Sequence, residues 1–136
     1  MRKSRPFTIG LAALATACAS FPDPGPTELA GSSWRLSSFN SRPSPSLMTF
    51  NFESAGRISG MIECNSFGGG YVVQPGRIVL QDVTRTLLGC DYSPPPDMNL
   101  RKSLRAVLTG PHIRYSVRAG QLIVTEGSNR LVFSRA

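Results

Sequence analysis

The fold of this chain is decided by the stretch Gly60-Met61-Ile62-Glu63-Cys64-Asn65-Ser66-Phe67-Gly68-Gly69-Gly70-Tyr71. Apolar and small residues alternate with polar ones before Cys64 and again after it, as expected for two strands that each bury one face. The glycine triplet lacks the Gly-Lys-Ser/Thr ending and the following helix that a phosphate-binding loop needs. We therefore interpret the triplet as a β-bulge or a close approach between backbones.

The same alternation extends toward both ends of the chain. About eight strands are expected, at residues 33–39, 47–53, 57–63, 67–73, 77–83, 112–118, 121–125 and 130–135. In the first strand, Trp34, Leu36 and Ser38 are expected on the buried face. Residues 40–45 are expected to form a loop, and residues 54–56 the turn of a hairpin.

One helix is expected, and it follows three consecutive prolines at residues 94–96. Asp97 is a suitable N-cap residue, because its side chain can accept hydrogen bonds from the free backbone N–H groups of the first turn. Gly110 and Pro111 end the helix. Four apolar residues have the i, i+4, i+7, i+8 spacing of a single buried stripe, namely Leu100, Leu104, Val107 and Leu108.

The first 17 residues are typical of a bacterial signal peptide. Three basic residues precede a short apolar stretch over residues 7–17, which is too short to span a bilayer. The sequence Leu14-Ala15-Thr16-Ala17-Cys18 then resembles the lipobox of bacterial lipoproteins, although its leucine lies one position earlier than is common. We expect lipidation of Cys18. The alternative is an ordinary signal peptide cleaved nearby, which would release a soluble periplasmic protein.

Residues 18–28 are expected to connect the lipid to a folded domain. The alternating prolines in this segment bar a helix and favour an extended conformation, so it acts as a spacer of about 25 to 30 Å. The residue after Cys18 is not acidic, which resembles lipoproteins that are sorted to the outer membrane. The expected location is the outer membrane, with a single domain at residues 29–136 facing the periplasm.

The cysteine count predicts a disulfide. If Cys18 carries lipid, Cys64 and Cys90 remain in an oxidising compartment, where an even pair in a small domain favours a bridge. Closing a loop of about 26 residues would stabilise the domain by about 3 kcal/mol in the chain-entropy model. The competing interpretation is a metal site, but the chain has one histidine and no CxxC or HxxxH spacing. We therefore expect no metal.

The positive charge does not indicate a nucleic-acid partner. The formal net charge is +7, but three of the basic residues belong to the expected signal peptide. The remaining basic residues are spread along the chain in no run longer than a pair, whereas a phosphate-tracking surface needs a cluster or a stripe. We interpret them as a solvated surface.

No catalytic site is expected. His112 is the sole histidine, and we interpret it as a structural or surface residue rather than part of a catalytic triad. Glu63, Asp91 and Asp97 lie near predicted turns or the helix start, where carboxylates solvate loops or cap helices. We therefore expect neither enzymatic activity nor a cofactor.

Three separated motifs resemble the META/HslJ family of small bacterial envelope domains. They are Leu29-Ala30-Gly31-Ser32-Ser33-Trp34, the central stretch Gly60–Tyr71 quoted above, and Thr86-Leu87-Leu88-Gly89-Cys90. They are similar to the family's L-x-G-x-x-W, G-x-x-G-C-N-x-x-x-G-x-Y and T-x-M-x-C patterns. Two positions depart from these patterns: Glu63 replaces a small residue, and Leu88 replaces methionine.

The resemblance implies a mostly β, α+β fold: an antiparallel, partly open β-barrel of about eight strands with one packed helix. Together with the lipobox and the tether, it predicts a noncatalytic envelope lipoprotein, attached to the membrane through its lipid, that binds another envelope protein or acts in envelope stress. A second function stays open, a carrier or sensor of a small apolar ligand, because aromatic residues could line a cavity. Those residues are Trp34, Phe50, Phe52, Phe67, Tyr71, Tyr115 and Phe133.

Overall fold

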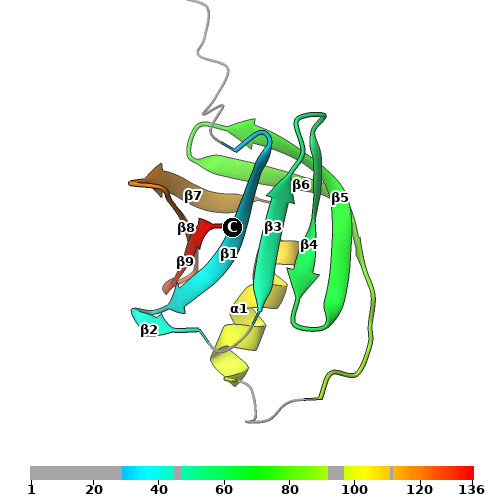
Figure 1. Cartoon of the computed structure of the whole chain (residues 1–136), viewed down its shortest axis with the longest axis vertical. Coiled ribbons are helices and arrows are strands. Elements are labelled where there is room, and N and C mark those ends of the chain that lie inside the picture. Colours follow the sequence, from blue (N-terminus) through cyan, green and yellow to red (C-terminus); the bar gives the residue numbers. More distant parts are fainter. Residues whose placement is uncertain (1–28, 45–46, 92–96, 111) are drawn as a thin grey trace, which may run out of the picture.

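Short alternating segments and tight turns build an antiparallel sheet that closes on itself. A computed structural model describes residues 29–44, 47–91, 97–110 and 112–136. The elements are β1 (Ser32–Phe39), β2 (Arg42–Pro43), β3 (Met48–Phe52), β4 (Arg57–Ile62), β5 (Asn65–Gln74), β6 (Arg77–Arg85), α1 (Met98–Thr109), β7 (Ile113–Arg118), β8 (Gln121–Glu126) and β9 (Asn129–Arg135). Within these residues the strand order is β2-β1-β3-β4-β5-β6-β7-β8-β9, and pairing of β1 with β9 closes an eight-stranded barrel (Figure 1).

The predicted fold class is confirmed, and the ring of strands has one weak seam. β6 and β7 pair only through Arg77 with Arg114 and Ile78 with Ile113. Between these two strands the chain leaves the sheet to form α1. The helix contacts both β6 and β8, so it packs where the sheet is least continuous.

Two sequence predictions about β1 and its neighbour were wrong. Residues 40–45 were expected to be a loop, but Arg42 and Pro43 form the short strand β2 and pair with Phe39 and Ser38. A register shift between Leu36 and Ser38 also changes the alternation of β1. Consequently Phe39 is buried in place of Ser38. A bulge inserts one residue and moves the following side chains to the opposite face.

The interior of the barrel is filled by side chains. All seven aromatic residues that could have lined a cavity belong to the buried core. The ring of Phe50 contacts three other rings, those of Phe52, Phe67 and Phe133, with centroids 5.6, 5.6 and 5.3 Å away. Such tilted and edge-on contacts are the arrangements that aromatic pairs prefer.

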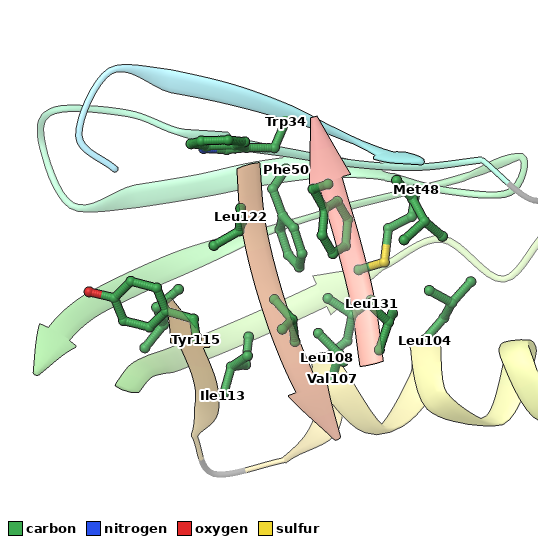
Figure 2. Packing of buried hydrophobic residues seen from close by; sticks show 14 of the residues in the cluster. Trp34, Met48, Phe50, Leu104, Val107, Leu108, Ile113, Tyr115, Leu122 and Leu131 are labelled. Carbon is green, nitrogen blue, oxygen red and sulfur yellow. The ribbon is translucent and has the colours of Figure 1, made fainter. Parts of the chain in front are cut away.

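The predicted helix covers one end of this core. Leu104, Val107 and Leu108 point from α1 toward the strands, on the same side as Leu131 and Met48 (Figure 2). The Asp97 side chain accepts hydrogen bonds from the backbone N–H groups of Asn99 and Leu100, at 2.8 and 3.3 Å. The predicted cap and buried stripe are both confirmed.

The strand paired with the glycine triplet contains a bulge. Gly68 pairs with Thr84 and Gly70 pairs with Gln81, so Gly69 faces two residues of β6. A Cβ atom on Gly69 would lie 2.7 Å from the carbonyl oxygen of Gln81. The extra residue therefore belongs to β6, where Asp82 has a positive φ of 50°. Of the two features expected for the triplet, it provides the close approach between backbones.

Candidate functional site

The most distinctive local structure joins the turn between β4 and β5 to the chain after β6. Cys64 and Cys90 form a disulfide, with their Cα atoms 5.7 Å apart, as the sequence predicts. The backbone N–H of Cys64 also donates to the sulfur of Cys90 over 3.3 Å. Residues 86–90 lie outside the strands but are fixed to the sheet at their C-terminal end.

Asn65 holds the middle of the same segment. Its side-chain oxygen accepts hydrogen bonds from the backbone N–H of Leu88 at 2.6 Å and from the hydroxyl of Thr86 at 2.9 Å. Its side-chain nitrogen donates to the carbonyl oxygen of Leu88 at 3.2 Å. One amide thus satisfies both backbone groups of Leu88, as a neighbouring strand would.

Thr86 connects this network to the edge of the sheet. Its backbone N–H donates to the carbonyl of Ser66 at 3.0 Å, and its hydroxyl accepts from the backbone N–H of Ser66 at 3.1 Å. The Cys-Asn and Thr-x-x-x-Cys motifs, separated in the sequence, therefore form one structural unit. That unit carries Leu87 and Leu88 in a defined backbone conformation.

Leu87 and Leu88 are largely exposed. Their side chains are 80% and 63% accessible to solvent, although the backbone that carries them is held at several points. They border a hollow of about 190 Å³ between the segment and α1, which three arginines also line. We define Arg85, Leu87, Leu88 and Arg105 as the leucine–arginine surface.

The third arginine of the hollow has an acidic partner. Arg101 on α1 forms an ion pair with Glu63, with Nε and Oε1 3.1 Å apart. Glu63 lies in the turn between β4 and β5 and has a left-handed backbone, with φ of 57°. Glycine adopts that conformation without steric strain, which accounts for the small residue that the family pattern has at this position. In this chain the carboxylate instead contacts the helix.

The other candidate residues lie apart from this unit. His112 is exposed and borders a different hollow together with Glu126. Asp97 caps α1, and Asp91 is exposed one residue after Cys90. Cys18 and the tether lie outside the described residues. Within the described ranges, no group of three or more His, Cys, Asp and Glu side chains is placed to hold a metal ion.

Tyr71 is a titratable residue whose hydroxyl the fold perturbs. Burial raises the pKa of its hydroxyl above the ordinary value. That hydroxyl donates a hydrogen bond to the carbonyl oxygen of Glu53 at 2.9 Å. Tyr71 is therefore a protonated structural donor at neutral pH.

Sequence reasoning missed the leucine–arginine surface. It identified Thr86-Leu87-Leu88-Gly89-Cys90 as a motif but assigned no role to its two leucines. The available signal was a pair of large apolar residues outside every predicted strand, beside an arginine and a cysteine. Their exposure depends on how Asn65 and the disulfide orient the backbone, and that is a tertiary property.

No helix in the described part of the chain has the length and apolar character needed to cross a membrane.

The comparisons with known proteins agree on the fold. An NMR structure of a protein from Burkholderia xenovorans is 21% identical over 99% of both chains, with a TM-score of 0.61. A second NMR structure is 21% identical over 80% of this chain and 92% of its own, with a TM-score of 0.65. A DUF4847 family protein from Bacteroides vulgatus ATCC 8482 is 14% identical over 81% of this chain and 96% of its own, with a TM-score of 0.56.

A comparison with curated protein sequences gives no match. The family model that matches is the META domain, over residues 27–136. This range contains all the described strands, the helix and both disulfide cysteines. The chain therefore belongs to the META domain family.

Proposed function

We propose that this protein is a noncatalytic lipoprotein of the bacterial envelope, and that its META domain binds another protein of the envelope. The observation that carries the proposal is the exposure of Leu87 and Leu88 on a segment held by a disulfide and by Asn65. Exposed leucines on a well-held backbone suit a binding surface, because less conformational entropy is lost when a partner orders them.

Burial of Leu87 and Leu88 by a partner is expected to contribute substantially to the free energy of binding. Burying a leucine side chain fully contributes about 1.5 to 3 kcal/mol, so two adjacent leucines supply the apolar centre of a modest interface. Two flanking arginines supply the polar rim that interfaces commonly have. The alternative, a carrier of a small apolar ligand, gains no support from the barrel interior, where the aromatic side chains pack on one another.

The envelope location rests on the sequence of the first 28 residues. A lipid on Cys18 would attach the protein on the side from which the chain enters β1. Figure 1 shows the start of β1 at one end of the barrel, and the β4–β5 turn and α1 toward the other. The leucine–arginine surface thus lies at the end of the barrel opposite the start of β1, away from the end at which the preceding segment joins the domain.

The anchoring is tested by the Cys18→Ser variant. We expect this variant to be released from the membrane fraction, or to accumulate as unprocessed precursor. The reason is that serine lacks the sulfur atom of Cys18 on which the lipid is expected. A single acyl chain gives only weak attachment, so several chains on Cys18 are expected in the wild type. Fractionation with gel mobility measures both outcomes. A variant that fractionates and migrates like the wild type would exclude lipidation of Cys18.

The binding function is tested by placing a photo-crosslinking amino acid at Leu88 in intact cells. We expect a discrete crosslinked species that disappears when Leu87 is also replaced by serine. The matched control carries the crosslinker at Val72, which is 45% exposed on β5, and should not give that species. Equal crosslinking at Leu88 and Val72, or none at Leu88, would contradict the proposal.

A further inference from the structure

We propose that the leucine–arginine surface recognises an acidic segment of a partner protein. In this proposal, the carboxylates of the segment contact Arg85 and Arg105, and an apolar side chain of the same segment covers Leu87 and Leu88. The inference rests on the proposed binding function and specifies the chemistry of the partner.

The charge of the surface is the first argument. Three arginines and one glutamate line the hollow. The glutamate is Glu63, and it is already paired with Arg101. Arg85 and Arg105 are exposed, and no acidic side chain in the described ranges forms an ion pair with either of them. Both guanidinium groups are therefore accessible to a carboxylate of a partner.

The nature of the charged groups is the second argument. A guanidinium presents a planar fork of donors that fits a carboxylate, and charge-assisted hydrogen bonds of this kind are stronger than neutral ones. Among the acceptors of a protein segment, ionised carboxylates form the stronger, charge-assisted hydrogen bonds with arginine. A segment that carries both carboxylates and an apolar residue would match the arginines and leucines that line this hollow.

The size of the hollow is the third argument. Its volume of about 190 Å³ is smaller than the roughly 300 to 1,000 Å³ of small-molecule sites. A free small ligand in this hollow would leave most of Leu87 and Leu88 in water. A protein segment can place one side chain in the hollow and still cover the leucines outside it.

The surface lies at the end of the barrel opposite the start of β1. Leu29, where the described chain begins, lies beside the start of β1, whereas Cys64 lies at the turn that follows β4 (Figure 1). The antiparallel pairing of β1, β3 and β4 places these two points at opposite ends of the barrel. An anionic lipid surface is kept as an outcome of the test.

The experiment uses the full lipidated protein in phosphatidylcholine vesicles and measures binding of fluorescent peptides by anisotropy. One peptide alternates aspartate and leucine, and its matched control alternates asparagine and leucine. We expect the acidic peptide to bind at least about tenfold more tightly than the amide peptide. The difference should shrink between about 0.01 M and about 0.15 M salt, as the Debye length falls from roughly 30 Å to roughly 8 Å.

Variants then locate the binding site. The double variant Arg85→Gln/Arg105→Gln should weaken acidic-peptide binding at least about tenfold, and Leu87→Ser/Leu88→Ser should weaken binding of the same peptide. The double variant Arg57→Gln/Arg118→Gln removes two exposed arginines from the other end of the barrel and should leave binding unchanged. Near-ultraviolet circular dichroism verifies that each variant is folded.

The outcomes separate this inference from the proposed function. Equal binding of both peptides, no binding of either, or wild-type binding by the Arg85→Gln/Arg105→Gln variant would overturn the acidic-segment inference. If the crosslink at Leu88 persists in those cases, partner binding stands and only its chemistry is wrong. Hydrogen exchange that slows at residues 85–90 in phosphatidylglycerol vesicles without peptide, and depends on the two arginines, would instead assign the surface to anionic lipid.

Discussion

Replacement of Trp34 by alanine is expected to lower the free energy of unfolding by about 3 to 5 kcal/mol, the range for large aromatic residues in protein cores. Trp34 is 0% exposed, so its removal leaves a cavity that its neighbours can fill only in part. Its indole N–H donates to the hydroxyl of Ser32 at 2.6 Å, and that hydroxyl donates to the carbonyl of Leu29. The substitution therefore also disturbs a buried polar chain at the start of β1.

Chemical denaturation with the disulfide intact measures this effect. The matched control is Val72→Ala, because Val72 is 45% exposed on β5 and its truncation leaves no internal cavity. Its effect should stay within about 0.5 kcal/mol. A loss of less than about 1 kcal/mol for Trp34→Ala would show that the indole does not support the core as described.

Loss of the disulfide is expected to have the second large effect. Cys64→Ala and Cys90→Ala should each lower the free energy of unfolding by about 2 to 5 kcal/mol. The bridge joins the β4–β5 turn to the chain that leads to α1. Its removal raises the conformational entropy of the unfolded state more than that of the native state, and this lowers stability. The double variant should be no less stable than the more damaged single variant, because the two cysteines act through one bond.

Denaturation of all three variants measures this comparison, and thiol labelling of the unfolded, unreduced wild type checks that the bridge is present. Two reactive thiols at Cys64 and Cys90 would exclude it. A double variant whose loss equals the sum of the single losses would show that each cysteine contributes separately. The contacts of Asn65 with Thr86 and Leu88 do not involve the bond itself. Hydrogen exchange at residues 86–90 would therefore show how much of the segment they hold on their own.

Most of the fold followed from local patterns. The strands of the barrel and the helix were predicted from alternation, helical spacing and turn residues, with small differences at their ends. The errors have local physical causes. The bulge in β1 exchanges Ser38 for Phe39 on the buried face, and the β1–β2 turn places Asn40 and Ser41 at positive φ, which alternation cannot reveal.

The sequence by itself determined the alternating strands, the capped helix and the pairing of Cys64 with Cys90, because each depends on residues close in the chain or on a count. Only the tertiary structure decided that Asn65 takes up both backbone groups of Leu88, that Arg101 rather than Arg85 or Arg105 pairs with Glu63, and that two leucines face solvent. The physical reason is distance along the chain. These contacts join residues 20 or more positions apart, and which of them form depends on sheet register and helix placement, which no local pattern encodes.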